Sequence, residues 1–364
     1  MTGALRRNAQ LLRERPNNFT LLRILFAVAV VYDHFYVLLS APEARYGFPW
    51  AELGVAAFFV TSGVLVTASY DEDPQLLRFW VKRLFRILPL YLLVVGCQGA
   101  VMSVIALSRG TFDLAELGHY LVMNALFMNF NAPAFGGVLD GFPTPAINPS
   151  LWTLKIELMF YAVLPLLMAV YRRLGFAWIA ALFIASTLFY EYFVDAQPML
   201  AKQLPGQIRY FAVGMAIALY FDRLDALKRP STRILALAVI ALVAVAGLVW
   251  FVPHASAFEP LFVASAVFIA AFWLPALWEP VDVSYGAYLF HAPIIQLSAV
   301  YGLYAADLLR LGALMVIVLS LAALAHIFIE KPGIKLGRAF IRASFRPNTP
   351  VIDLVLQPTR VKDQ

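Results

Sequence analysis

Residues 19–40 read FTLLRILFAVAVVYDHFYVLLS, an apolar run that is long enough to cross a bilayer as one helix. The run contains Arg23 and, eleven positions later, His34. Eleven residues make almost three helical turns, so both side chains are predicted to project from one face, roughly 16 Å apart along the axis. A titratable group within a membrane span is costly and is by default a functional-site hypothesis. The stretch therefore predicts a polar path that runs into a bilayer.

The composition of the whole chain supports a membrane setting. Of 364 residues, 62% are hydrophobic and only 14% are charged, whereas soluble domains average about a quarter charged residues. The single cysteine, Cys97, excludes an intramolecular disulfide and a cysteine metal cluster. The net charge of +6 is explained better by membrane topology than by nucleic-acid binding.

Repeated apolar runs predict an all-α, polytopic bundle of about ten spans. The predicted spans are 19–40, 50–69, 87–107, 150–171, 176–193, 206–221, 234–252, 259–279, 283–304 and 309–329. If 114–130 does not cross, 21 Lys and Arg fall on one side and three on the other. Cytoplasmic loops carry such an excess, so we expect 114–130 to be a surface or re-entrant segment and both termini to be cytoplasmic.

The segment 78–91, RFWVKRLFRILPLY, places Arg83 and Arg86 one turn apart on a helical face where the chain enters the membrane. Paired guanidinium groups suit bidentate phosphate recognition. The alternative is an ordinary basic flank that contacts the head groups of membrane lipids.

The segment 148–165, NPSLWTLKIELMFYAVLP, predicts a helix with Ser150 as its N-cap. Glu157 would lie roughly 10 Å below the helix start, at a depth similar to that of His34. Glu157 is either a functional acid or the structural ion-pair partner of Lys155 or Arg209.

The segment 284–294, SYGAYLFHAPI, places His291 in mid-helix, shortly before Pro293. It is either a packing residue or part of a site. The five histidines include no ligand-like i, i+4 pair, so no metal site is expected. In the second span, GVAAFFVTSG (54–63) offers small residues that either allow close helix packing or leave room for a narrow ligand.

These pieces together resemble the acyltransferase-3 family of integral-membrane acyltransferases. The matching segments, in family order, are LRILFAVAVVYDHF (22–35), GVAAFFVTSG (54–63), RFWVKRLFRILPLY (78–91), SLWTLKIELMFY (150–161), SYGAYLFHAPI (284–294) and IEKP (329–332). The resemblance implies a single membrane acyltransferase domain over 1–340, with a basic cytoplasmic tail at 341–364, in a bacterial inner membrane.

The resemblance also implies a reaction, the transfer of an acyl group, most often acetyl, to a hydroxyl of a carbohydrate or glycoside. His34 matches the expected catalytic residue and Arg23 its partner, while Glu157 matches the family's acidic residue. Arg83 and Arg86 match an Arg-x-x-Arg implicated in handling acyl-CoA, the expected donor. Trp152, Tyr288 and His291 are the expected substrate-binding residues.

On this hypothesis His34 acts as a general base on the acceptor hydroxyl. An acyl-histidine intermediate is an open alternative. A rival interpretation is a secondary transporter or flippase for an anionic or lipid-linked substrate, because intramembrane His and acidic groups also mark such pathways. The chain shows no internal repeat of the kind that transporters often carry.

Overall fold

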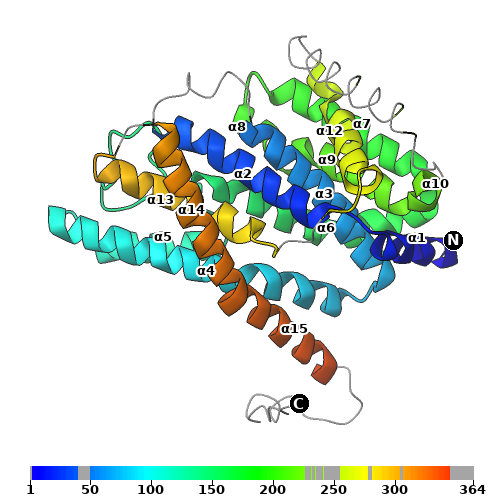
Figure 1. Ribbon diagram of the computed structural model, residues 1–364, viewed down its shortest axis with the longest axis horizontal. Coiled ribbons are helices and arrows are strands. Elements are labelled where there is room, and N and C mark those ends of the chain that lie inside the picture. The colour runs from blue at the N-terminus through cyan, green and yellow to red at the C-terminus, as the bar shows by residue number, and fades with distance from the viewer. Residues whose placement is uncertain are drawn as a thin grey trace.

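The computed structural model describes residues 2–39, 50–225, 231, 234, 241, 255–277, 281–303 and 306–344. Within these ranges the chain forms helices and no strands (Figure 1). The first half contains α1 (Thr2–Glu14), α2 (Phe19–Leu38), α3 (Trp50–Glu72), α4 (Leu76–Arg109), α5 (Leu114–Ala125), a 3₁₀ turn (Pro149–Leu151) and α6 (Trp152–Leu174). The second half contains α7 (Phe176–Phe193), α8 (Pro198–Ala201), α9 (Leu204–Leu219), α10 (Phe221–Asp225), a 3₁₀ turn (Ala255–Ala257), α12 (Glu259–Phe268) with a π-helical turn (Ile269–Trp273), α13 (Ser284–Val300), α14 (Leu308–Ala325), a second π-helical turn (His326–Glu330) and α15 (Lys331–Ser344).

The prediction of an all-α membrane protein is confirmed. Among the described residues, six helical segments are long and apolar enough to cross a membrane: Phe19–Leu38, Trp50–Glu72, Leu76–Arg109, Pro149–Leu174, Phe176–Phe193 and Leu308–Ser344. Helices α9, α12 and α13 are shorter. The predicted span 234–252 lies largely outside the described residues, so the number of ten spans stays a prediction.

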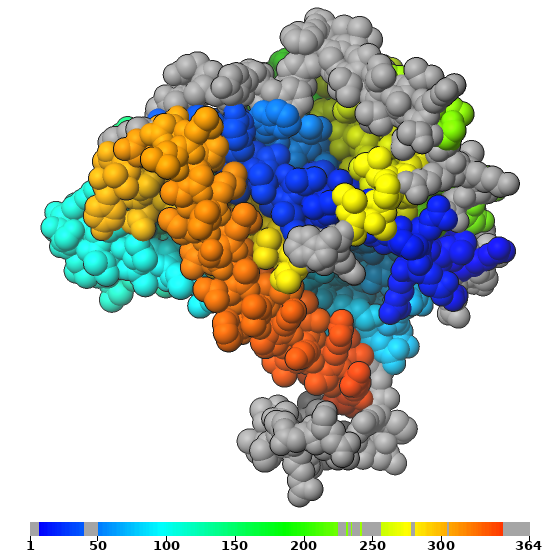
Figure 2. Space-filling model, in the orientation of Figure 1, coloured from blue at the N-terminus to red at the C-terminus, as the bar shows by residue number. Residues whose placement is uncertain are grey.

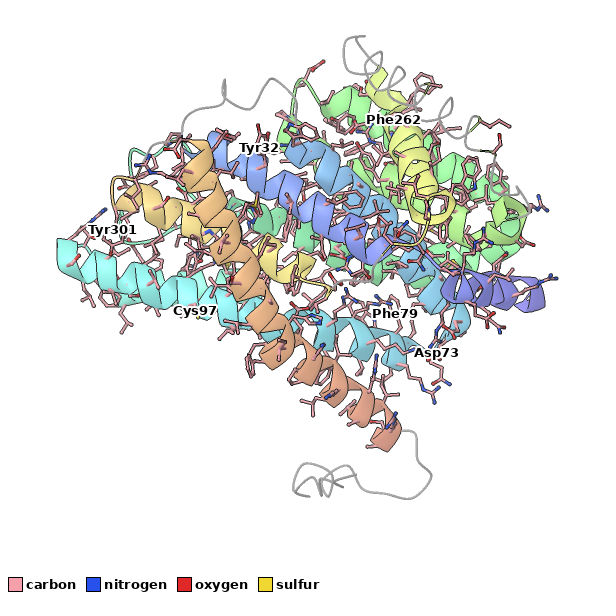
Figure 3. All side chains as sticks on the ribbon, viewed as in Figure 1. Tyr32, Asp73, Phe79, Cys97, Phe262 and Tyr301 are labelled. Carbon is pink, nitrogen blue, oxygen red and sulfur yellow. The ribbon has the colours of Figure 1, made fainter. Side chains whose placement is uncertain are left out.

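The long helices run between two ends of the bundle, named here after the helix that lies at each. At the α1 end, Arg13 of α1 pairs with Glu72 at the end of α3 at 3.1 Å. Also at this end, Asn8 Nδ2 donates to the carbonyl of Leu219, where α9 ends, at 2.8 Å. The opposite end is the α5 end. Asp73 lies toward the α1 end and Tyr301 toward the α5 end in Figure 3.

Close backbone contact between α3 and α9 forms the centre of the bundle. A Cβ added at Gly214 would lie 2.3 Å from the carbonyl oxygen of Val60, and one at Gly63 would lie 2.6 Å from that of Phe211. Helices in a membrane gain much of their association from such packing at small residues. Gly63 is therefore a packing residue, whereas its neighbour Ser62 faces a cavity.

The segment 114–130 forms a short helix that turns back into the bundle. Helix α4 ends at Arg109 and is followed by Gly110 in the left-handed conformation, and Asp113 caps α5 through the backbone N–H groups of its first turn. Tyr91 of α4 then donates to the carbonyl of Asn124 at 2.6 Å, so α5 lies back along α4. With 12 residues α5 is too short to cross a bilayer alone.

Helices α14 and α15 cross the front of the molecule in Figure 2, and α15 projects beyond the rest of the bundle. Helix α15 packs on α4, where Gly333 and Gly337 approach Phe85 so closely that a Cβ on either would clash. The helix runs to Ser344, so it extends past the boundary that the sequence predicts at residue 340 between domain and tail.

Candidate active site

His34, His291 and Ser150 meet inside the bundle. His34 Nδ1 lies 2.8 Å from His291 Nε2. The hydroxyl of Ser150 lies 3.3 Å from His34 Nδ1 and 3.2 Å from His291 Nε2. His291 is fully buried and His34 is half-buried. Three separate segments, α2, α13 and the turn before α6, therefore supply one cluster.

The hydrogen bonds assign a proton to each ring of this pair. His291 Nδ1 lies 3.2 Å from the carbonyl oxygen of Ala287, to which only a protonated nitrogen can donate. In the neutral ring, Nε2 of His291 is then an acceptor, and His34 Nδ1–H donates to it. This leaves Nε2 of His34 without a proton, as a general base requires.

The turn that carries Ser150 is held by a carbonyl group that Pro293 leaves without a helical hydrogen bond. Proline has no N–H, so the carbonyl of Leu289, four residues earlier, loses its helical partner. Asn148 Nδ2 donates to that carbonyl at 3.0 Å, while its Oδ1 accepts from the N–H of Ser150 at 3.3 Å. Asn148 therefore joins the interrupted helix α13 to the turn. It also caps that turn in place of Ser150, whose hydroxyl is engaged by the two histidines.

Toward the α1 end lies a cavity of about 280 Å³ that we call the arginine cavity. Its lining includes three basic residues, one acid and several hydroxyl groups: Arg23, Arg83, Arg86, Glu157, Ser62, Tyr161, Ser284 and Tyr285. Glu157 accepts hydrogen bonds from Ser62, at 3.0 Å, and from Tyr161. Arg83 lies 5.7 Å from the ring centroid of Tyr161, and its Nε has no hydrogen-bond partner among the described residues. The cavity thus concentrates positive charge inside the bundle.

Asp282, just before α13, joins two of these arginines. Its Oδ2 lies 2.6 Å from Arg23 and 3.4 Å from Arg86. Its Oδ1 accepts from the hydroxyl of Ser284 at 2.6 Å and from the N–H of Ser284 at 3.3 Å. Burial alone would raise the pKa of Asp282, but the two guanidinium groups and the Ser284 bonds outweigh it and lower the pKa below its usual value. Asp282 is therefore a carboxylate.

On the other side of His34 lies a second cavity of about 430 Å³, the histidine cavity. Besides His34, its lining includes Trp152, charged residues of both signs, and polar side chains: Glu52, Lys202, Gln207, Arg209, Ser256 and Glu259. Val55 and Tyr288 line both cavities. The hydroxyl of Tyr288 is held by Thr153 at 2.7 Å and by the carbonyl of Ser150 at 3.2 Å. A wall that includes Val55 and Tyr288 thus separates two chemically different spaces.

Arg209, which lines the histidine cavity, is held by several neighbouring side chains and a backbone carbonyl. Its guanidinium stacks over Tyr190 at 3.5 Å, donates to the carbonyl of Ser256 at 3.1 Å, and lies 3.9 Å from both Glu191 and Glu259. Lys155 instead donates to Gln203 at 2.7 Å. No hydrogen bond or ion pair in the described part of the chain joins Glu157 to Lys155 or Arg209, the two partners that the ion-pair alternative requires.

The structure thus divides the predicted residues between two spaces. Arg23, Arg83, Arg86 and Glu157 line the arginine cavity. His34 and Trp152 line the histidine cavity, Tyr288 lines both, and His291 is buried against His34. The described residues contain no group of three His, Cys, Asp or Glu side chains that could hold a metal ion.

Sequence reasoning missed Asp282, Asn148 and the contact of Ser150 with the histidines. Asp282 is 259 positions from Arg23, and no local pattern joins them. An Asp two residues before the Ser that starts α13 is a capping signal, but capping alone does not predict an arginine partner.

Comparison with known proteins places the chain in a family. The acyltransferase-3 profile, described as an acyltransferase domain, matches residues 17–327. Nodulation protein 10 of Rhizobium leguminosarum bv. viciae is 28% identical over 360 residues, which cover 89% of this chain and 95% of that protein.

Two longer relatives are named as peptidoglycan enzymes. The putative peptidoglycan O-acetyltransferase YrhL of Bacillus subtilis is 28% identical over 85% of this chain, and the peptidoglycan O-acetyltransferase OatA of Listeria monocytogenes is 26% identical over 87%. The chain spans about half, 55%, of the length of each. No solved structure is significantly similar to it. The family match covers the helices that carry both cavities, and the chain belongs to the acyltransferase-3 family of membrane proteins.

Proposed function

We propose that the protein transfers an acyl group, acetyl in the simplest case, from acyl-CoA to a hydroxyl of a carbohydrate or glycoside. The observation that carries the proposal is the position of His34. Its Nδ1 is engaged by His291, and the residue lines a polar cavity that only a thin wall separates from a cavity with three arginines. The names of the peptidoglycan O-acetyltransferases support transfer to oxygen.

The arginine cavity suits the donor. Guanidinium groups recognise phosphates through paired hydrogen bonds, and Arg83 and Arg86 stand one turn apart on α4. About 280 Å³ is too small for the nucleotide together with its arm, so the phosphates would stay near the arginines while the narrow arm extends toward Tyr288 and His34. Arg23 and Glu157 would contact the donor on this path.

The histidine cavity suits a sugar. Hydroxyl-rich ligands need many donors and acceptors, which Glu52, Gln207 and Lys202 offer, and Trp152 provides an aromatic face. A cavity of about 430 Å³ lies in the usual range for small-molecule sites.

In the proposed transfer, the proton of the acceptor hydroxyl moves first to His34 and then to the leaving thiolate. His34 Nε2 takes the proton of the acceptor hydroxyl while its oxygen bonds to the thioester carbonyl carbon. The carbon–sulfur bond then breaks, and the proton passes from His34 to the departing thiolate. His291 Nε2 accepts from His34 Nδ1–H throughout, so it fixes the ring and stabilises the transient imidazolium.

The proposal includes an orientation. Acyl-CoA is a cytoplasmic metabolite, so the α1 end, with the arginine cavity, would face the cytoplasm of a bacterial inner membrane. Both termini would then be cytoplasmic. The basic residues of α15 would then contact lipid head groups.

The test is acetyl-CoA turnover by purified protein in nanodiscs, supplied with a mixture of glycoside acceptors and radiolabelled acetyl-CoA. We expect His34→Ala to abolish release of free CoA and transfer of label. His119→Ala, on α5 away from both cavities, should retain wild-type turnover. Activity of His34→Ala near the wild-type rate would refute the base assignment. In a parallel assay with the protein in sealed vesicles, label that crosses the membrane without CoA release would favour the transporter.

A further inference from the structure

Asp282 is bonded to two of the arginines that line the cavity of the proposed donor. Arg23, Arg86 and Ser284, its side-chain partners among the described residues, all line the arginine cavity. A guanidinium that is bonded to a carboxylate offers fewer N–H groups to a phosphate. The carboxylate and an incoming phosphate therefore compete for Arg86, and the same carboxylate oxygen also holds Arg23.

The two oxygens of Asp282 do different work. Oδ2 faces Arg23 and Arg86, whereas Oδ1 accepts from the hydroxyl and the N–H of Ser284, the first residue of α13. Loss of the arginine contacts at Oδ2 leaves the bonds of Oδ1 to Ser284 in place. The exchange of partners therefore leaves α13, which carries His291, fixed at its first turn.

We propose that Asp282 is an internal counter-ion that holds Arg23 and Arg86 in the absence of a donor and is displaced by the donor's phosphates. This inference rests on the proposed function. Asp282 is a positioning residue: it touches neither acyl group nor acceptor, and it sets how tightly a phosphorylated donor binds. Without it, three arginines would face the acid Glu157 alone in a confined space.

The discriminating variant is Asp282→Asn. The amide oxygen can still accept from Ser284, while the amide NH₂ repels guanidinium groups and frees them for phosphate. We expect the affinity for CoA, measured by titration calorimetry in nanodiscs, to rise by about fivefold, the upper range for one partly exposed ion pair. The KM for acetyl-CoA should fall similarly with kcat within about twofold. The KM for acetyl-pantetheine, which has no phosphate, should not change.

Asp73→Asn is the matched control. Asp73 also pairs with two cations at the α1 end, Lys82 at 2.9 Å and Arg78 at 3.8 Å, but it does not line the arginine cavity (Figure 3). Its removal should leave CoA affinity unchanged. If Asp282→Asn proves unfolded by its melting curve, Asp282→Ser replaces it, since serine also caps helices and carries no charge.

Each outcome decides between two roles. Unchanged or weaker CoA affinity in a folded Asp282 variant would overturn the inference, because Asp282 would then hold the arginines in place for the donor. A wild-type protein that binds CoA but never turns over acetyl-CoA would refute the proposed function and leave the counter-ion role standing. Absence of CoA binding in wild type and variants alike would refute both.

Discussion

At the scale of single residues, the pairing of His34 with His291 is the feature with the clearest chemical meaning. A lone imidazole exchanges its two neutral tautomers freely, whereas the bond from His291 Nδ1 to Ala287 selects one tautomer in each ring of the pair. His291 thus performs for His34 the orienting task that a carboxylate performs in the serine protease triad. Because it is neutral, it does so without bringing a charge into the bundle.

We predict that His291→Leu lowers kcat by about 100-fold, the lower range for a correctly placed general base. His291→Gln should retain more activity, since its amide oxygen can still accept from His34 Nδ1–H. Acetyl transfer rates and their pH profiles measure both effects. If the two variants lose the same activity and keep the wild-type pH profile, the residue only fills space.

At the scale of elements, the interruption of α13 at Pro293 is balanced by the turn before α6. A buried carbonyl without a partner costs about 1–3 kcal/mol, and Asn148 supplies the partner of Leu289. The same amide caps the turn that carries Ser150. The side chain of Asn148 therefore both stabilises the interrupted helix and positions Ser150.

We predict that Asn148→Ala destabilises the protein by about 1–3 kcal/mol and that Pro293→Ala offsets part of this loss. Alanine at 293 restores an N–H that can bond Leu289. Unfolding in detergent measures the free energies of unfolding of the two single variants and of the double variant. As a control, the effect of Asn17→Ala, which removes a bond to Arg15 at the α1 end, should simply add to that of Pro293→Ala. If the effects of Asn148→Ala and Pro293→Ala also simply add, the two residues are not coupled.

Local patterns were sufficient to predict most of these elements and insufficient to predict how they pair. Apolar length marked α2, α3, α4, α6, α7 and α14, and spacing placed Arg23 and His34 on one face. One partner of each residue lies more than 250 positions away, Asp282 for Arg23 and His291 for His34, and no periodic signal carries that information. Whether Glu157 would lie with the arginines or beside His34 also depended on helix packing.

At the scale of the whole molecule, both ends of the bundle carry recognisable features. The ends of α3, α6 and α9 lie near α1, and Arg172 in the last turn of α6 approaches Asp71 of α3 at 3.9 Å. Arg13, Arg78, Lys82 and Arg172 lie at this end. The positive-inside rule associates such a collection with a cytoplasmic face, in agreement with the proposed orientation.

We predict that a cysteine at Gln10, in α1, is protected from a membrane-impermeant maleimide in spheroplasts, and that one at Asp195, beyond α7, is labelled. Cys97→Ala provides the background, because Cys97 is the single native cysteine. Both positions are exposed and lie at opposite ends of the bundle. The reverse labelling pattern would invert the orientation.

The wall shared by the two cavities has a consequence for the cell's energy supply. Val55 and Tyr288 face both spaces, so wherever the two cavities reach opposite sides of a membrane, this wall is also a permeability barrier. Protons driven by the membrane potential, about 2.3 kcal/mol per charge for each 100 mV, would move along any continuous file of water through it. A wall thin enough for an acyl group to be handed across must therefore remain an insulator between turnovers.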